Sequence, residues 1–265
     1  MPPEPPTQPR PSPTSDTAAV RAISEARCVA VLTGAGMSAE SGIPTFRGGM
    51  EALWKDFDPM QLATPEAYAA DPETVTRWYD WRRVKCMEAE PNAGHRALVR
   101  LQAELTRRGG GLDILTQNVD GLHARAGSAG VVELHGSIMR WRGVRTGVDC
   151  PTPDGPFDAF PPTSPDGEPL RPGVVWFGEP LPTQAVEAAY EAANACDVLL
   201  TIGTSAAVYP AAGFIDIAAA NGAVTIEVNP DDTEASDRVD IVLRGTAAVV
   251  LPELVERAFG AERDQ

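Results

Sequence analysis

Short apolar runs recur along the chain, and most are separated by segments in which apolar residues repeat with a helical period. The runs have the length of buried strands and span 28–33, 112–116, 131–135, 174–177, 197–203, 223–228 and 240–243. The helical patterns cover 94–108, 183–195, 211–221 and 252–259. This alternation predicts an α/β fold, a Rossmann-like parallel sheet with helices on both faces.

Two segments interrupt the alternation. Residues 50–92 indicate helices and contain Trp54, Trp78 and Trp81, whereas residues 136–173 are rich in proline and show little periodicity. We expect these two insertions to pack together as a smaller module beside the sheet. The Rossmann-like part would then comprise 21–49, 93–135 and 174–260.

The N-terminal segment differs from the rest in composition. Seven of the first 13 residues are proline, which predicts a disordered tail over residues 1–20 and a folded domain over 21–260. This segment has neither the basic-then-apolar pattern of a secretion signal nor the many arginines of a transit peptide. We therefore expect a cytoplasmic protein.

Composition narrows the classes of function. The net charge of -15 and a pI near 4.6 argue against a broad basic surface for nucleic acid. No apolar stretch has the length needed to cross a bilayer, so we expect no membrane association. The four cysteines lie far apart without a Cys-x-x-Cys pair, which favours a reduced protein. The oligomeric state stays open.

The first apolar run ends in a glycine-rich loop. Gly34, Ala35, Gly36, Ser38 and Ala39 belong to a stretch that fits G-x-G-x-x-G/A directly after a predicted strand, a pattern typical of dinucleotide binding. A strand-to-helix turn without a ligand has the same pattern. No acidic residue ends a second strand about 20 residues later, as it would in a dehydrogenase, so ordinary hydride transfer is not expected.

Six sequence blocks occur in a fixed order: GAGMSAESGIPTFRG (34–48), TQNVDGLH (116–123), ELHG (133–136), VVWFGE (174–179), GTSAAVYPAA (203–212) and EVNP (227–230). With these blocks the sequence resembles the sirtuins, the NAD-consuming protein lysine deacylases, from about Arg21 to Leu254. The resemblance implies that the acyl oxygen of a modified lysine attacks the ribose as nicotinamide leaves. The resulting imidate is resolved by the ribose 2′-hydroxyl and water, giving free lysine and O-acyl-ADP-ribose.

The resemblance also assigns a binding site for NAD as cosubstrate. It implies that Asn118 orients the ribose, that Asp120 contacts the carboxamide, and that Phe46 and Arg47 belong to a flexible lid. The implied cofactor-binding residues are Gly34, Ala35, Gly36, Ser38, Ala39, Phe46, Arg47, Gln117, Asn118, Asp120, Gly203, Thr204, Ser205, Asn229 and Ala247. Taken alone, the Asn and Asp residues fit a turn, and Thr204 and Ser205 fit a helix cap.

Three histidines are available for base chemistry. His135 is the expected catalytic base, because the unperturbed pKa of histidine lies near neutrality. An isolated histidine would more simply be structural, but the ELHG block favours the base. Asn118, which orients the ribose, is the second expected catalytic residue. His95 is expected to be structural in the first turn of a helix. His123 is expected to form a local hydrogen bond.

The VVWFGE block is implied to bind acylated lysine proteins, the expected partners. Val174, Val175, Trp176 and Phe177 would wall the acyl-lysine channel, and the backbone would pair with the substrate peptide as an added strand. Read without the resemblance, these residues form an ordinary buried strand.

Tyr79 and Arg82 are the expected determinants of the acyl group. They lie three positions apart on a predicted helix, so they project from one face, and a hydroxyl with a guanidinium suits a carboxylate. They resemble the Tyr-x-x-Arg pair of the sirtuin branch that removes succinyl, malonyl and glutaryl groups. We favour removal of acidic acyl groups, with acetyl removal as a second activity. For an arbitrary Tyr-x-x-Arg the alternative, a solvated helix with Arg82 and Arg83 as surface charges, would be favoured.

One expected feature of sirtuins is missing. The family usually holds a structural zinc with two Cys-x-x-Cys pairs, but the corresponding positions hold Gly143, Thr146, Thr163 and Asp166. Cys150 alone cannot form a tetrahedral site, so we expect no metal. We expect the proline-rich stretch to stabilise the module in part.

Two other functions use the same cofactor pocket. NAD hydrolysis or ADP-ribosyl transfer would need no acyl-lysine, and a non-catalytic NAD or ADP-ribose sensor would need no base. Asn118, Asp120 and His135 favour catalysis, and the VVWFGE block favours deacylation over the other enzymatic class.

Overall fold

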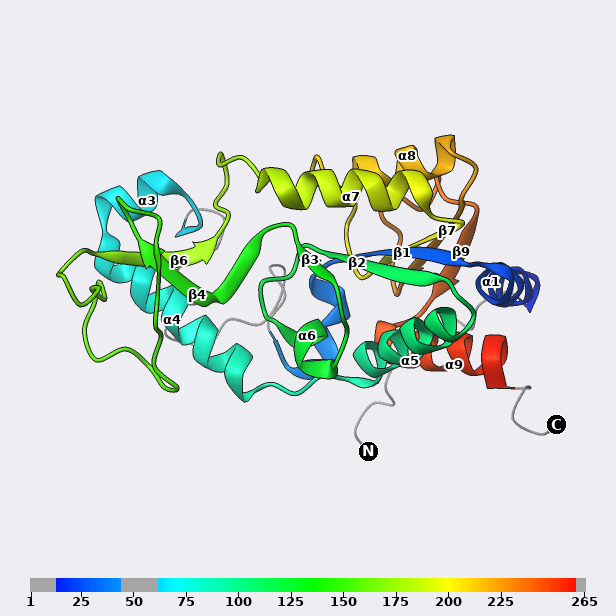
Figure 1. Ribbon diagram of the computed structural model, residues 1–265, viewed down its shortest axis with the longest axis horizontal. Coiled ribbons are helices and arrows are strands. Elements are labelled where there is room, and N and C mark those ends of the chain that lie inside the picture. The colour runs from blue at the N-terminus through cyan, green and yellow to red at the C-terminus, as the bar shows by residue number, and fades with distance from the viewer. Residues whose placement is uncertain (1–12, 44–61, 261–265) are drawn as a thin grey trace, which may run out of the picture.

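The computed structural model describes residues 13–43 and 62–260. They form an elongated molecule with a large parallel sheet at one end and a small antiparallel sheet at the other (Figure 1). No helix in these two ranges is long and apolar enough to cross a membrane.

The larger sheet has six strands in the order β3-β2-β1-β7-β8-β9, and every neighbouring pair is parallel. Chain order runs outward from β1 on one side and from β7 on the other. Ligands of such sheets bind beyond the carboxyl ends of the strands at this reversal. The strands are β1 (Cys28–Thr33), β2 (Gly111–Thr116), β3 (Val131–Glu133), β7 (Val198–Ile202), β8 (Val224–Asn229) and β9 (Ile241–Arg244).

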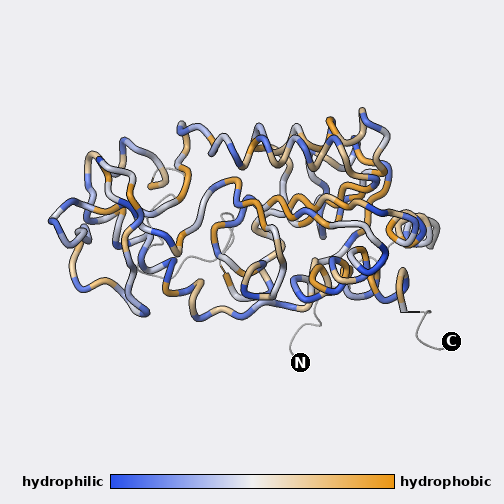
Figure 2. The backbone as a smooth tube through the Cα atoms, in the orientation of Figure 1, coloured by the Kyte–Doolittle hydropathy of each residue, from blue (hydrophilic) through white to orange (hydrophobic). Residues whose placement is uncertain are grey.

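Helices cover both faces of this sheet, because successive side chains of each strand point to opposite faces. In β1, Val29 and Val31 belong to the core shared with α5 and α9, whereas Ala30 and Leu32 belong to the core shared with α7 and α8. Figure 2 shows the hydrophobic residues gathered in the strands between these layers. The helices are α1 (Pro13–Glu25), α5 (Ala93–Arg107), α6 (Leu122–Ala126), α7 (Thr183–Ala195), α8 (Gly213–Ala220) and α9 (Ala247–Phe259).

The predicted fold class is confirmed, with two corrections. Disorder over residues 1–20 is wrong for 13–20, because α1 begins at Pro13 and packs Ala19 and Ile23 into the core; residues 1–12 lie outside the described part. The run 174–177 is not a strand of the parallel sheet. Val174 ends β6 (Leu170–Val174), and residues 175–177 form no strand.

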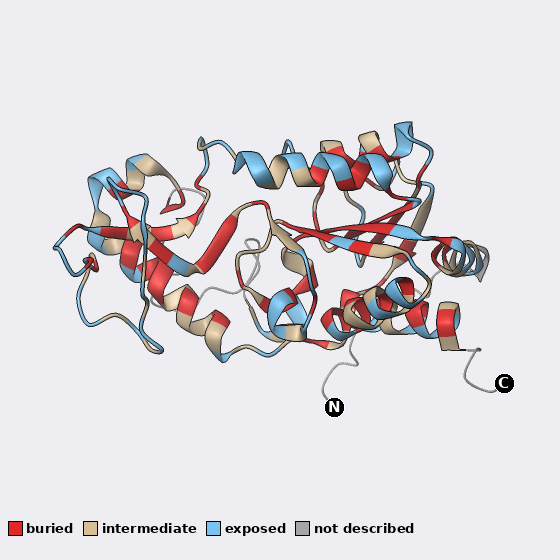
Figure 3. Ribbon diagram, in the orientation of Figure 1, coloured by how far each residue is buried: buried red, intermediate tan, exposed pale blue. Residues whose placement is uncertain are grey.

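The smaller sheet forms from the proline-rich segment, which showed little periodicity. Its order is β5-β4-β6, with β4 (Gly136–Gly143) in the centre and β5 (Asp149–Cys150) at one edge. Together with α3 (Pro65–Ala70) and α4 (Pro72–Glu88), this sheet encloses its own core around Trp78, Trp141 and Trp176. Figure 3 shows the long buried stretch of β4 beside the exposed outer turns.

Helix α4 also carries a buried ion pair. Arg83 donates to Asp80 at 2.7 Å, and both side chains are at most 3% exposed. The same guanidinium donates to the carbonyls of Pro153 (2.8 Å) and Gly155, and Asp80 accepts from the N–H of Phe157 at 3.0 Å. The pair therefore fastens the loop between β5 and β6 to the helix.

Removal of one partner from this pair leaves a charge buried without its counter-ion. We expect Asp80→Ala to lower the free energy of unfolding by about 3–5 kcal/mol, measured by urea denaturation. The matched control is Glu73→Ala, which breaks the exposed Glu73–Arg77 pair of the same helix and should cost less than about 1 kcal/mol. Equal losses in the two variants would contradict a structural role for the buried pair.

Candidate functional site

The predicted site residues converge at the carboxyl edge of the large sheet. Gly34 follows β1, Gln117 follows β2, and Gly203 follows β7, while Asn229 ends β8. These four strands are neighbours in the sheet, so segments far apart in sequence meet at the point where the strand order reverses.

The glycines at this edge are required by the contact of two loops. Gly34 and Gly36 donate their N–H groups to the carbonyls of Ile202 (3.0 Å) and Gly203 (2.8 Å). A Cβ on Gly36 would lie 2.7 Å from the Cα of Gly203, and one on Gly203, whose φ is 58°, would lie 2.4 Å from the N of Met37. The motif that we interpreted as cofactor binding therefore also has a structural requirement.

The residues after Gly34 form two short 3-10 turns rather than the start of a helix. Ala35–Met37 and Ala39–Ser41 are these turns, and Ser38 lies between them. Ser38 is buried and donates to Asp120 Oδ2 at 2.7 Å. The expected lid residues Phe46 and Arg47 lie outside the described residues.

Asn118 and Asp120 bind the glycine loop from the side of β2. Asn118 donates through Nδ2 to the Gly34 carbonyl (3.0 Å) and to Ser38 Oγ (3.2 Å), and Asp120 Oδ1 accepts from the N–H of Leu122 at 2.9 Å. A small pocket opens beside them, and its lining includes Thr116, Asn118, Asp120, His123 and Glu133. Amide, hydroxyl and carboxylate groups here offer both donors and acceptors to a polar ligand.

Burial has the largest effect on the pKa of Asp120. It raises the pKa of this carboxyl, while the Leu122 N–H, the Ser38 hydroxyl and the charges of Arg82 and Arg125 act in the opposite direction. Arg82 belongs to α4 of the small module, so a cation of that module acts on the carboxylate at the edge of the large sheet.

His135 lies between the two sheets, in the link from β3 to β4. Its Nδ1 is 3.0 Å from the Gln117 carbonyl, and its own carbonyl accepts from the N–H of Val175 at 2.9 Å. Since a carbonyl can only accept, Nδ1 carries the proton and Nε2 is the free basic position. Burial lowers the pKa of His135, with the Gln117 carbonyl opposing, so the neutral ring is favoured near pH 7.

The other two histidines are structural, as expected. His95 lies in the first turn of α5 and accepts from the N–H of Asn92, and burial lowers its pKa to about 4. His123 Nε2 is 3.0 Å from Thr33 Oγ1, and burial lowers its pKa to about 3. Thr33 also donates to Thr116 at 2.8 Å. This buried polar chain was missed, although both threonines end apolar runs.

Hydrogen bonds join the remaining loops across the strand ends. Gln117 donates to Thr204 Oγ1, and Asn229 donates to the Thr204 carbonyl, both at 3.0 Å. The carbonyl of Ser205 accepts from the N–H of Glu234 at 3.3 Å. Ala247 is the first residue of α9 and is buried in the core on the α5 side.

Tyr79 and Arg82 lie in the small module beside the VVWFGE block. The Tyr79 ring is 4.6 Å from that of Trp78 and 6.3 Å from that of Trp176. The Arg82 guanidinium lies 4.6 Å from the Trp78 ring and 5.6 Å from the Tyr79 ring. Burial raises the pKa of Tyr79 to about 12, so its hydroxyl remains a hydrogen-bond donor at neutral pH.

An ion pair that the sequence did not reveal holds residues 174–179 in place. Arg171 donates to both carboxylate oxygens of Glu179, at 2.6 and 2.9 Å, and lies 3.4 Å above the Trp176 ring. Glu179 also accepts from the N–H of Trp176 at 2.9 Å. No periodicity or motif marks this pair, because it consists of two charged residues flanking an apolar run.

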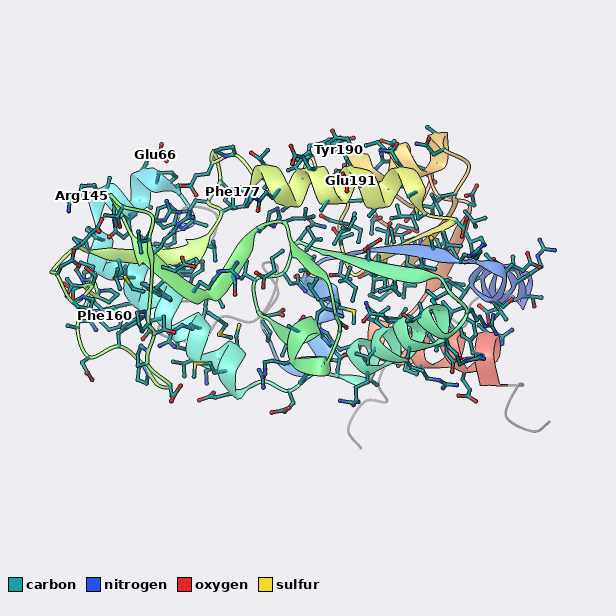
Figure 4. All side chains as sticks on the ribbon, in the orientation of Figure 1. Glu66, Arg145, Phe160, Phe177, Tyr190 and Glu191 are labelled. Atoms are coloured by element: carbon teal, nitrogen blue, oxygen red, sulfur yellow. The ribbon has the colours of Figure 1, made fainter. Side chains whose placement is uncertain are left out.

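These contacts restrict how a peptide could pair with the block. The N–H groups of Val175, Trp176 and Phe177 already donate to His135, Glu179 and Ala63. An added strand would therefore have to donate to carbonyl groups of this segment. Phe177 is 40% exposed, and Figure 4 shows it between the two parts of the molecule.

The residues at the four expected cysteine positions do not fit a zinc ion. Gly143 has no side chain, Thr146 Oγ1 donates to Glu168 at 2.8 Å, and Asp166 accepts from Ser164 at 2.5 Å. Within 13–43 and 62–260, no three His, Cys, Asp or Glu side chains are grouped as a metal site would require.

The polar edge of the large sheet, by contrast, fits a nucleotide. It combines buried hydroxyl and amide groups with a carboxyl group and a neutral imidazole, at the carboxyl ends of the strands, where parallel sheets bind such ligands. The histidine has a free Nε2 that can accept a proton, and the aromatic residues Tyr79 and Trp176 lie in the adjoining module.

Comparison with known proteins agrees with this geometry. An NAD-dependent protein deacylase of Thermus thermophilus is 50% identical over 244 residues, with 90% of this chain and 95% of that protein covered. A Sir2 homolog solved as an NAD complex is 43% identical, with a TM-score of 0.85 and coverage of 92% and 94%. A mutant Sir2 homologue in complex with 2'-O-acetyl ADP ribose has 43% identity, a TM-score of 0.84 and coverage of 92% and 96%.

The family model described as the Sir2 family matches residues 34–210. These residues include the glycine loop, the Asn118 and Asp120 cluster, His135 and the VVWFGE block. The chain therefore belongs to the Sir2 family.

Proposed function

We propose that this protein is an NAD-dependent lysine deacylase that prefers succinyl, malonyl and glutaryl groups and also removes acetyl groups. The observation that carries the proposal is the neutral His135, which lies next to Gln117 at the polar strand edge and next to Val175 of the VVWFGE block. The proposed base therefore contacts both the strand edge that we assign to the cofactor and the segment that we assign to the substrate.

His135 is the proposed general base. Its Nδ1 proton is committed to the Gln117 carbonyl, which fixes the ring and leaves Nε2 to accept a proton from a ribose hydroxyl. NAD, when bound, supplies the ribose carbon to which the acyl oxygen bonds as nicotinamide leaves. Asn118 and Asp120 are proposed to orient the ribose and the carboxamide.

The phosphates and the adenosine are assigned to the other strand ends. The N–H groups and hydroxyls around Gly34, Ser38, Thr204 and Ser205 are proposed to line the phosphates and adjacent ribose, with Asn229 and Ala247 near the adenosine. Hydrogen bonds support this assignment, because Gln117 and Asn229 both donate to Thr204 and so hold the loops after their strands against the loop after β7.

The acyl preference rests on the small module. Tyr79 keeps its proton and can donate a hydrogen bond. Arg82 lies over the rings of Trp78 and Tyr79, and its charge acts on Asp120 at the cofactor edge. A carboxylate at the far end of the acyl chain would receive a hydroxyl and a guanidinium there. An acetyl group has no carboxylate and would make neither of these contacts.

A single experiment separates deacylation from the other uses of NAD. The protein is incubated with NAD and a succinyl-lysine peptide, an acetyl-lysine peptide or no peptide, and the products are followed by mass spectrometry. We expect O-succinyl-ADP-ribose as the main product. ADP-ribose without peptide would instead indicate NAD hydrolysis, and unchanged NAD in all three reactions would indicate a sensor.

Loss of the base should reduce the rate of the chemical step. We expect His135→Ala to lower kcat by about 10²–10⁴-fold, while NAD binding measured by calorimetry persists. For the unmodified protein, the acid limb of kcat/KM should lie below pH 6.5, because burial lowers the pKa of His135 and the neutral form is active. An acid limb above pH 7 would contradict this role.

Removal of the Arg82 charge should change specificity rather than overall activity. We expect Arg82→Met to lower kcat/KM for a succinyl-lysine peptide by about 30-fold or more, since a charged hydrogen-bonded pair contributes about 2–3 kcal/mol. Deacetylation should change less than about threefold. The matched control is Arg77→Met on the exposed side of α4, and parallel loss of both activities in Arg82→Met would remove the assignment.

A further inference from the structure

The outer end of the small module contains a carboxylate that joins two turns. Glu168 Oε1 accepts from the N–H groups of Arg145 (2.6 Å) and Thr146 (2.9 Å), and Oε2 accepts from Thr146 Oγ1 (2.8 Å). We call these three residues and Ser164 the carboxylate clasp. Figure 4 shows Arg145 at the end of the molecule away from the large sheet.

Ser164 completes the clasp from the second turn. Its hydroxyl accepts from the N–H of Glu168 at 3.0 Å and donates to Asp166 at 2.5 Å. Thr163 forms a bridge with Pro169, whose carbonyl accepts from the N–H of Val144 at 3.0 Å. The turn at 143–148 and the turn at 163–169 are thus fixed to each other.

All four positions that hold zinc cysteines in the sirtuin pattern belong to these two turns. At the first, a Cβ on Gly143 would lie 2.4 Å from Thr146 Oγ1 and 2.5 Å from Glu168 Oε2. A cysteine at this position and the closed clasp therefore exclude each other. Thr146, at the second position, is itself a donor of the clasp.

We propose that the carboxylate clasp replaces the structural zinc of the family, so that the small module of this chain is closed without a metal. Glu168 is buried and accepts three hydrogen bonds, which compensate the charge of its carboxylate. In a zinc site the metal ion would compensate the charge of the cysteine thiolates in the same way. The pKa of Glu168 lies below its usual value, chiefly because the carboxylate accepts from the Thr146 N–H. Burial opposes this shift, whereas the Thr146 hydroxyl and the N–H and charge of Arg145 add to it.

The first test compares Glu168→Gln with Glu73→Gln, an exposed glutamate on α4 of the same module. We expect the melting temperature to fall by about 4 °C or more for Glu168→Gln and by less than about 1 °C for the control. Amide hydrogen exchange should show faster exchange at Arg145 and Thr146 in Glu168→Gln alone.

A second variant tests the exclusion at position 143. Gly143→Ala should lower the melting temperature by a similar amount. In the Glu168→Gln background the same substitution should lower the melting temperature by less than it does in the unmodified protein, because the clasp is already open. Additive losses in the double variant would contradict the proposed contact.

Metal content tests the replacement itself. We expect less than about 0.1 zinc per chain in the purified full-length protein, and the same melting temperature with and without a chelator. The proposal is overturned by about one zinc per chain, or by Glu168→Gln with unchanged melting and unchanged exchange at both amides. These readouts do not depend on activity, so failure of the proposed function would leave them unaffected.

Discussion

The close contact between the loop after β1 and the loop after β7 is the constraint on which the site depends. Gly36 and Gly203 approach so closely that neither position has room for a side chain, and Gly203 has a backbone conformation that favours glycine. This contact joins the loops that follow β1 and β7, the two strands at which the chain order reverses. As a consequence, Ser38 and Thr204 lie at the carboxyl edge of the sheet. There Asn118 donates to Ser38, and Gln117 donates to Thr204.

Burial also shifts the pKa values of the groups to which we assign roles in the reaction. It lowers the pKa of His135, which favours the neutral ring that we propose as the base, and it raises the pKa of Tyr79, so the hydroxyl keeps its proton. Burial also raises the pKa of Asp120, and the Leu122 N–H, the Ser38 hydroxyl and the Arg82 charge reduce this shift. Burial therefore acts on all three groups, and the hydrogen-bond partners of each group decide how far its pKa moves.

The large sheet could be predicted from the sequence because its strands are buried on both faces and appear as continuous apolar runs. The helix over 183–195 was predicted with the bounds that the structure gives. The small sheet could not be predicted, since β4 alternates irregularly and contains Arg140 and Arg142 between buried residues. Residues 174–177 resembled a buried strand because they form a continuous apolar run, although only Val174 belongs to a strand.

The candidate site was more predictable where it follows a strand than where it depends on ion pairs. Gln117, Asn118 and Gly203 lie where the ends of apolar runs place them. Arg171 and Glu179 are brought together only by the fold of the segment between them. Asp80 and Arg83 are neighbours on one helix, but their burial against the loop between β5 and β6 arises only from tertiary packing. Helix α1 was missed because prolines dominate the residues before it, although Ala19 and Ile23 repeat at helical spacing.

The small module is held by carboxylates that accept from backbone N–H groups. Asp80 accepts from Phe157, Glu168 accepts from Arg145 and Thr146, and Glu179 accepts from Trp176. Two of these carboxylates also bind an arginine, and Arg171 adds a stacking contact with Trp176. Because Trp176 packs in the same core as Tyr79, the ion pairs that order this module also set the position of the proposed acyl pocket. In the arrangement that we propose, these charge pairs take over the ordering role of a metal on the side of the module that binds the acyl-lysine.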